Sequence, residues 1–469
     1  MDMAFDDLLE MAAGKEKRNS GAASNCYINI FIMKKTNALL IGLFLNSSIT
    51  AQKNDNWSFL SETERIVKTL ASDELAGRFP FTPGIDKAAT FIADEFKKAG
   101  LQPWDGKSFF QSFTVAQFRF ISGNAVVNGE QVAEENVFFI TSKELLQANE
   151  RSADFETAYI SKADTLFVQY GRLRRTQKKN LVIFVDTSHR KLLGANSSYY
   201  QKYYSDFPEY NSFYKWDKDI VVIFTDKKPE NWSVEFRQRA EYKEVKNVVG
   251  LLRGTKLSNE RVVFSAHYDH LGIRKPNAEN DSIYNGANDD ASGVAAIIQL
   301  AHHFSKKRNN ERSLLFSAFT FEEIGGFGAM YFSRQYDSAS IIADFNIEMI
   351  GSINEKGIGA AYITGFEYSD FGKILQKNLE GSPYNFHPDS LGRFHLSDNY
   401  TLALKGIPAH TISTDRGPQE PFYHTPDDEW DKLDHKNMNE VIKAIAASAK
   451  TIIAGKDTPT RIDVNKLKR

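Results

Sequence analysis

Cysteine is almost absent from this chain, which has one, Cys26, among its 469 residues. A single cysteine excludes a disulfide framework and a thiolate metal site. Any metal must therefore be held by histidine, aspartate and glutamate side chains. An excess of either charge is also missing, because 58 basic residues stand against 60 acidic ones, for a formal net charge of -2. This balance gives no electrostatic reason to expect nucleic acid or an anionic membrane as a partner.

The sequence also lacks an apolar run long enough to cross a bilayer, which predicts no transmembrane helix in the mature chain. The apolar stretch 38–45 is short and follows two lysines, an order that is typical of a signal peptide. A buried strand or helix is the alternative for this stretch. We therefore expect Met33 to be the true start, residues 1–32 to be an upstream extension and residues 33–51 to be a signal peptide. The mature protein is then exported, either to a periplasm or out of the cell.

The remaining chain has the composition of a globular protein, with 42% hydrophobic and 25% charged residues, and it is too long for one ordinary domain. Between residues 113 and 241 it becomes rich in aromatic residues and short strand-like runs, which we interpret as an inserted subdomain. The flanking segments, 55–112 and 242–455, are expected to form one domain. Residues 456–469 are polar and are expected to be a loose tail.

Apolar strands alternate with helical patterns from residue 247 onward. This alternation predicts an α/β fold, a three-layer sandwich whose mixed, mostly parallel central sheet is flanked by helices. The expected strands lie at 247–254, 261–266, 313–320, 344–350 and 407–413, and the expected helices at 61–70, 85–98, 293–304, 327–335 and 437–453.

Histidine and carboxylate residues follow several of these strands, where open α/β sheets place their ligands. His267 comes directly after the strand 261–266, and Asp269 is close enough to accept a hydrogen bond from its imidazole, as an outer partner of a metal-bound histidine does. His270 is a further candidate ligand. Because His270 lies one residue beyond Asp269, however, we expect its side chain to point elsewhere.

Two pairs of adjacent carboxylates stand at similar positions. Asp289 and Asp290 precede the helix 293–304, where one carboxylate could bridge two metal ions; a helix cap is the alternative. Glu322 and Glu323 end an apolar strand. One of them can bind metal while the other accepts a proton from water, and an exposed acidic turn is the alternative.

Two further residues complete the set. Glu348 interrupts an apolar strand, and a buried lone carboxylate needs a partner or a metal. His424 precedes a Pro-Asp turn. Together the histidines and carboxylates suit a hydrolase with two metal ions, and imidazole and carboxylate ligands favour zinc, with cobalt or manganese as alternatives.

The order and context of these motifs resemble the double-zinc aminopeptidases, which include bacterial leucyl aminopeptidases and, more distantly, glutamate carboxypeptidase II and glutaminyl cyclase. The resemblance covers residues 72–450 apart from the insert. The motifs that carry it are SDELAGR at 72–78, AHYDH at 266–270, NGANDDASG at 285–293, TFEEIGG at 320–326, FNIEMIG at 345–351 and FYHTPDD at 422–428.

The resemblance implies how two zinc ions would be held. His267 binds the first ion, and Glu323 and His424 bind the second. Asp289 bridges both ions, and its peptide bond to Asp290 is cis in the family. Glu348 stands where most members have aspartate, and it is assigned to the first ion.

The same resemblance implies the chemistry. Glu322 acts as the general base, Asp269 supports His267, and the substrates are peptides with a free N-terminus. A glutaminyl cyclase-like transferase and a non-catalytic binding module on the same fold are the alternatives. The sequence leaves open the side-chain preference and the oligomeric state.

Overall fold

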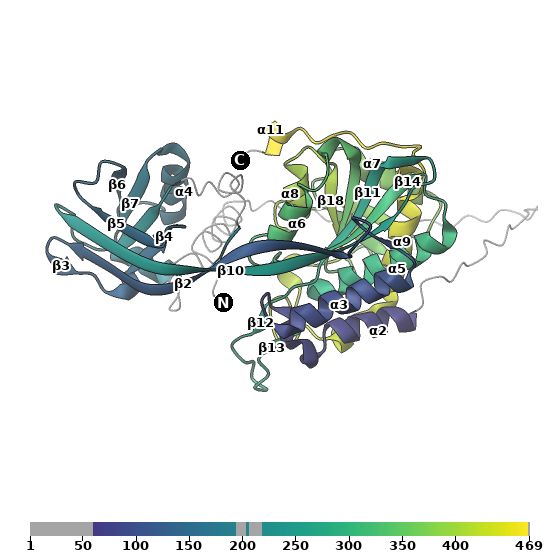
Figure 1. Cartoon of the computed structure of the whole chain (residues 1–469), viewed down its shortest axis with the longest axis horizontal. Helices are drawn as coiled ribbons and strands as arrows, with labels where there is room; N and C mark the ends of the chain where they lie inside the picture. The colour runs from purple at the N-terminus through teal and green to yellow at the C-terminus, as the bar shows by residue number, and fades with distance from the viewer. Residues whose placement is uncertain (1–59, 194–202, 206–217, 468–469) are drawn as a thin grey trace, which may run out of the picture. The chain divides into compact units, whose positions relative to one another are not determined.

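The computed structural model describes residues 60–193, 203–205 and 218–467. The expected upstream extension, the signal peptide and Cys26 lie outside the described residues. The described chain divides into two compact units (Figure 1). We call residues 118–240 the inserted unit and residues 60–117 with 241–467 the main unit. Within the described residues, no helix is long and apolar enough to cross a membrane.

The main unit is built on a mixed sheet in which the strands follow the order β17-β16-β18-β15-β11-β14-β10. Strand β11 pairs in parallel with β14 and β15, and β18 pairs in parallel with β15, whereas β10 and β16 join the sheet antiparallel to β14 and β18. The strands span Trp232–Leu252 (β10), Leu257–His267 (β11), Arg312–Phe319 (β14), Ile341–Ile347 (β15), Ala360–Ile363 (β16), Asn385–Pro388 (β17) and Ala409–Ser413 (β18). The predicted α/β fold with a mostly parallel sheet is confirmed.

Helices cover both faces of this sheet. Along β11, Val262 and Phe264 pack into a core that includes α2, α3, α5 and α9, while Val263 packs into a second core that includes α6 and α8. A strand buried on both faces is continuously apolar, which explains the run of hydrophobic residues in its sequence. The helices span Leu60–Leu70 (α2), Pro83–Lys98 (α3), Ser292–Lys307 (α5), Phe327–Phe332 (α6), Phe371–Leu379 (α7), Asn399–Ala403 (α8), His435–Ser448 (α9) and Lys450–Ile453 (α10).

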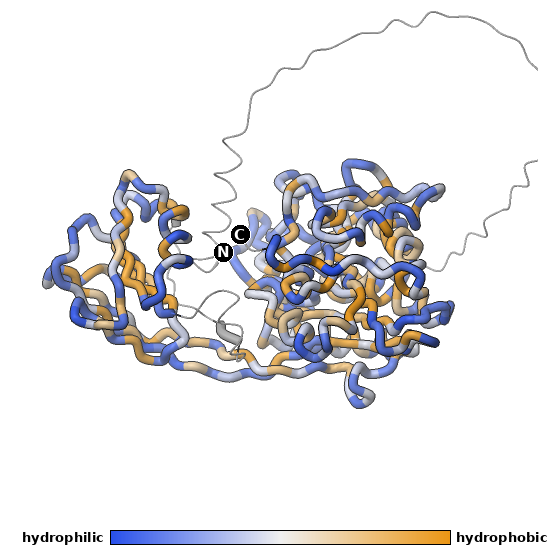
Figure 2. Tube along the Cα trace, turned by 90° about the horizontal axis from the view of Figure 1, so that it is seen from above, coloured by the Kyte–Doolittle hydropathy of each residue, from blue (hydrophilic) through white to orange (hydrophobic). Residues whose placement is uncertain are grey.

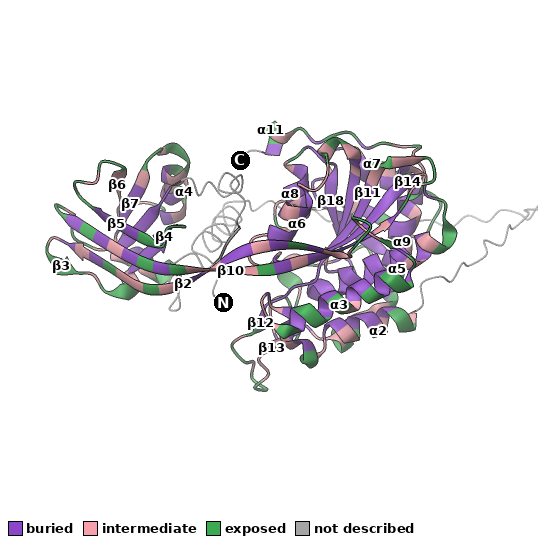
Figure 3. Cartoon of the chain, viewed as in Figure 1, coloured by how far each residue is buried: buried purple, intermediate pink, exposed green. Residues whose placement is uncertain are grey.

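Burial follows this layering. The central strands of the main unit are buried along most of their length (Figure 3), and apolar stretches run through the interior of the unit (Figure 2). At the centre, the ring of Phe264 stacks on Phe316 and Phe345 at centroid distances of 5.5 and 4.9 Å. This rigid centre holds the ends of β11, β14 and β15 at one edge of the sheet.

The inserted unit contains a second sheet with the order β4-β9-β7-β6. Two of the strand-like runs expected between residues 113 and 241, at 181–186 and 220–226, form β7 and β9, and these strands lie side by side in parallel. Successive residues of β7, such as Ile183 and Phe184, point to opposite faces of the strand and enter two different cores. The elements of this unit are β2 (Phe110–Val127), β3 (Glu130–Gln131), β4 (Val137–Ile140), β5 (Leu145–Asn149), β6 (Phe155–Ile160), α4 (Leu166–Thr176), β7 (Asn180–Val185), β8 (Tyr203–Ser205) and β9 (Ile220–Phe224). Strands β2 and β10 contribute residues to both units.

Two expectations about local structure are wrong. The segment 456–467 is not loose, because Ile462 and Leu467 are buried and Arg312 donates hydrogen bonds to the carbonyl of Asp457 and the hydroxyl of Thr458. Strand β15 ends at Ile347, so Glu348 follows the strand and does not interrupt it. Its side chain is thereby freed from the pleat of the sheet.

Candidate metal centre

Three parallel strands bring the expected site residues to one edge of the main sheet. His267 is the last residue of β11, and Glu348 directly follows β15. Glu322 and Glu323 lie in the turn that follows β14. Because β11 lies between β14 and β15 and all three run parallel, their carboxyl ends meet at the same place.

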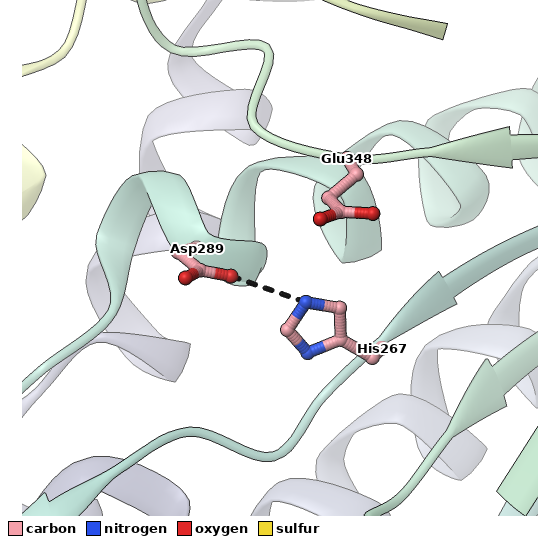
Figure 4. Close-up of side chains that lie close together, drawn as sticks. All are labelled: His267, Asp289 and Glu348. Carbon is pink, nitrogen blue, oxygen red and sulfur yellow. Dashed lines mark ion pairs between the residues drawn. The ribbon is translucent and has the colours of Figure 1, made fainter. Parts of the chain in front are cut away.

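One group of ligand atoms surrounds a first position for a metal ion. Oxygen and nitrogen atoms of His267, Asp289 and Glu348 all lie within 4.8 Å of one another (Figure 4). The Nε2 atom of His267 is 3.1 Å from Oδ1 of Asp289, but it is buried and forms no hydrogen bond. A buried nitrogen without a hydrogen bond is costly unless another group binds it. The arrangement therefore fits a cation between these atoms.

A second group lies on the other side of Asp289. The Nε2 atom of His424 is 3.2 Å from Oδ2 of Asp289 and 3.2 Å from Oε2 of Glu323. The Nδ1 atom of His270 is 2.7 Å from Oε1 of Glu323. The expectation that His270 points elsewhere is thus wrong, since its ring is buried and faces the acidic residues.

Asp289 connects the two groups. Its Oδ1 faces His267 and its Oδ2 faces His424, and its peptide bond to Asp290 is cis, as the resemblance implies. Burial alone would raise the pKa of Asp289, but the adjacent imidazoles of His267 and His424 lower this pKa well below its usual range. The carboxylate is therefore ionised and presents one oxygen to each position.

Asp290 fixes the backbone around the first position. Its Oδ2 accepts the N–H of His267 at 3.3 Å, and its Oδ1 accepts the N–H groups of Gly293 and Met349 at 2.9 and 3.1 Å. One carboxyl group thus ties together the chain beside His267, Asp289 and Glu348.

Asp428 and Arg78 hold the same region from the outside. The carboxylate of Asp428 accepts the N–H of Asn288 through Oδ1 and the N–H of Asp289 through Oδ2, at 2.8 and 3.1 Å. The fully buried guanidinium of Arg78 donates only to backbone carbonyls: those of Leu70, Tyr268, Asn285 and Gly286. The sequence shows both residues inside motifs, but no local pattern indicates these long-range contacts.

Asp269 contacts two site residues in a way that differs from the expectation. The backbone carbonyl of Asp269, rather than its carboxylate, lies 3.2 Å from Nδ1 of His267, and the carboxylate Oδ1 is 3.9 Å away. The same Oδ1 accepts the N–H of Glu322 at 3.1 Å. Asp269 therefore orients His267 with its main chain and Glu322 with its side chain.

The electrostatics separate the two adjacent glutamates. Burial raises the pKa of Glu322 well above its usual range, and the nearby Glu348 and Asp398 raise it further against the opposing effect of His267. Burial would also raise the pKa of Glu323, but His424 and His270 lower it to about 2. Glu322 thus binds a proton readily, while Glu323 stays ionised beside two imidazoles.

The donor set fits zinc ions at both positions. The ligand atoms are imidazole nitrogens and carboxylate oxygens. They are spaced 2.7 to 3.9 Å apart around the second position, and at the first position His267 Nε2 is 3.1 Å from Asp289 Oδ1. Such spacings suit atoms that share one ion at about 2.0–2.2 Å. Within the part of the chain that the structure describes, no lysine or arginine forms a salt bridge with these buried carboxylates. The carboxylates would repel one another, and divalent cations would offset this repulsion.

Comparison with known proteins agrees with this geometry. Residues 247–449 match the model of Peptidase family M28. The chain is 37% identical over 111 residues to a probable zinc metalloprotease of Pyricularia oryzae, which is 23% of this chain and 22% of that protein. It is 26% identical over 275 residues to a probable leucine aminopeptidase of Arthroderma otae, which is 52% of this chain and 70% of that protein. The chain thus spans less than a quarter of the length of the first of these relatives.

Solved structures share the fold. A zinc aminopeptidase of Bacillus subtilis superposes with a TM-score of 0.51 at 15% identity, covering 87% of this chain and 99% of that one. An aminopeptidase of Aneurinibacillus sp. strain AM-1 gives the same score at 17% identity, covering 87% and 96%. The family match and the shared fold confirm the predicted resemblance to the double-zinc aminopeptidases.

Proposed function

We propose that this chain, which carries the M28 peptidase match, is an exported zinc-dependent aminopeptidase that removes N-terminal residues from peptides with two metal ions. The observation that carries this proposal is the position of Asp289, whose two carboxylate oxygens face two separate groups of ligand atoms. A carboxylate with one oxygen on each side suits a two-metal hydrolase, because the ions of such enzymes lie about 3.5–4 Å apart.

His267 and Glu348 would hold one ion, and Glu323 and His424 the other, with Asp289 shared. The ions, when bound, supply a positive charge that polarises the scissile carbonyl and lowers the pKa of the attacking water. Glu322 takes the proton from this water and later gives it to the leaving amine. Asp269 keeps the backbone of Glu322 in place.

The proposed substrates are peptides with a free amino terminus. The relative in Arthroderma otae has leucine aminopeptidase in its name, which agrees with this substrate class.

The test is a comparison of wild type with Glu322→Gln. The variant keeps the shape of the side chain but cannot accept a proton, so we expect it to retain about two zinc ions per chain and to lose turnover of aminoacyl-arylamides by about two to four orders of magnitude. Near-normal turnover would remove Glu322 from the mechanism. Metal analysis that finds no zinc in a folded chain would overturn the whole site.

A glutaminyl cyclase-like transferase is the second candidate, since the sequence resemblance extends to that enzyme, which uses one zinc ion. The second group of ligands around His424 favours the peptidase. Measuring aminoacyl-arylamide cleavage beside cyclisation of N-terminal glutamine on the same preparation separates the two activities.

The export part of the proposal is supported by the apolar stretch 38–45 and the lysines before it. If residues 33–51 are a signal peptide, the secreted chain begins at Gln52. N-terminal sequencing of the protein from the medium or periplasm tests this point. A chain recovered only from the cytoplasm with Met33 or Met1 intact contradicts it.

A further inference from the structure

We propose that His270 is a fourth protein ligand of the second metal ion, so that the second position binds zinc more tightly than the first and fills before it. This inference rests on the proposed two-metal site and adds a residue to it. It makes the two positions chemically unequal.

The contacts of His270 lead to this assignment. Its Nδ1 atom lies 2.7 Å from Oε1 of Glu323 and 3.9 Å from Oδ2 of Asp289. These are the two carboxylates that His424 also faces, at 3.2 Å from each. One ligand atom from each of His270, Asp289 and Glu323 lies within 4.8 Å of the other two. Because His424 contacts two members of this group, four side chains converge on one position, and four is the usual number of ligands around zinc.

The fold reserves space for this imidazole. The N–H of His270 donates to the carbonyl of Arg78 at 3.4 Å. Gly286 stands against the ring, because a Cβ atom at that position would lie 2.5 Å from Cγ and Cδ2 of His270. Arg78 in turn donates to the carbonyl of Gly286 at 2.8 Å. The ring is thus held on a backbone support and is not free to turn toward solvent.

The two positions then differ in their ligands. The first has one imidazole and two carboxylates, from His267, Asp289 and Glu348. The second has two imidazoles and two carboxylates, from His270, His424, Glu323 and the shared Asp289. Imidazole suits zinc well, while carboxylate-rich sites accept manganese more readily. Zinc should therefore fill the second position first, and the first position should lose or exchange its metal more easily.

The deciding experiment uses the whole metal-free chain loaded with one equivalent of zinc. X-ray absorption at the zinc edge counts imidazole ligands. We expect two imidazoles in wild type, one in His270→Gln, and two in the control His302→Gln, whose side chain is 40% exposed and contacts Glu95. One imidazole in wild type overturns the proposal, and this measurement does not depend on whether a variant folds.

A zinc titration against a chromophoric chelator gives an independent result. His270→Gln should weaken the tighter binding step by more than about 100-fold, which exceeds the 10- to 100-fold loss typical when an outer partner of a ligand is removed. A smaller loss assigns His270 an outer role and overturns direct binding. Wild type that binds zinc with one imidazole refutes only this inference, whereas wild type that binds no zinc refutes the proposed function as well.

Discussion

Replacing Asp428 with asparagine should weaken metal binding although Asp428 is not one of the proposed metal ligands. Its carboxylate is buried and accepts the N–H groups of Asn288 and Asp289 with separate oxygens, at 2.8 and 3.1 Å. These two hydrogen bonds hold the peptide that carries the bridging carboxylate. Asp428 also lies four residues after His424, so the same contact joins the segments that carry two ligands of the second position.

The expected size of the effect follows from the hydrogen bonds. Asparagine keeps one oxygen but replaces the other with an NH2 group, so one of the two buried N–H groups loses its acceptor. Leaving a buried donor unpaired costs about 1–3 kcal/mol. If this cost falls on the conformation that binds metal, zinc affinity falls about 5- to 150-fold.

The assay is a zinc titration of the metal-free chain in competition with a chelator, with thermal unfolding measured beside it. Asp427→Asn is the matched control, because the neighbouring Asp427 is exposed and its Oδ1 accepts a bond only from the side chain of Asn277. The control should bind zinc like wild type. If Asp428→Asn also binds zinc like wild type and unfolds at the same temperature, the supporting role of Asp428 is refuted.

Three further perturbations test other parts of the structure. Glu348→Asp should weaken the less tightly held zinc ion by at least tenfold, about 1.4 kcal/mol, because the shorter side chain withdraws from His267 and Asp289; a zinc titration measures this. Burial lowers the pKa of His410 to about 4, below about 6.5 in the unfolded chain, so stability should fall as the pH drops from 6.5 toward 4, by up to about 3 kcal/mol. Urea unfolding midpoints of wild type and His410→Gln over that range check it, and a midpoint that falls equally in both contradicts it. Burial raises the pKa of Asp344 to about 7, so its contribution to stability is present below pH 3.8 and is lost as the pH rises through 7. Asp344→Asn should therefore raise the urea midpoint more at pH 8 than at pH 4, and an equal shift at both values refutes the assignment.

The layered fold could be predicted from the sequence because burial leaves a strong pattern. The apolar runs that end before His267 and Glu322 coincide with β11 and β14, and the helix expected at 293–304 lies inside α5. The strand expected at 247–254 covers only the last part of β10, and the full lengths of β2 and β10 were not predicted. Their residues alternate between buried and exposed over much of their length and resemble several short strands. The packed end of the chain was missed because a polar segment held by Arg312 has no apolar pattern.

The position of His270 could not be predicted for a related reason. Within a strand, successive side chains point to opposite faces, so their directions follow from counting. Strand β11 ends at His267, and the irregular chain beyond it obeys no such rule. The roles of the two polar groups of Asp269 were undetermined for the same reason, since its carbonyl and its carboxylate lie near different partners, His267 and Glu322.

Adjacent acidic residues divide their work in this site. Asp289 faces the histidines, while Asp290 accepts three backbone N–H groups. Because Asp290 accepts these hydrogen bonds, the lone pairs of Asp289 stay available for metal. Glu323 likewise faces two imidazoles, whereas Glu322 has a raised pKa and accepts a proton. The two members of an adjacent acidic pair in this site are therefore not equal candidates for a metal ligand. Each pair supplies one ligand together with either the support that orients it or the base that works beside it, so replacing one member of a pair should damage the site in a different way from replacing the other.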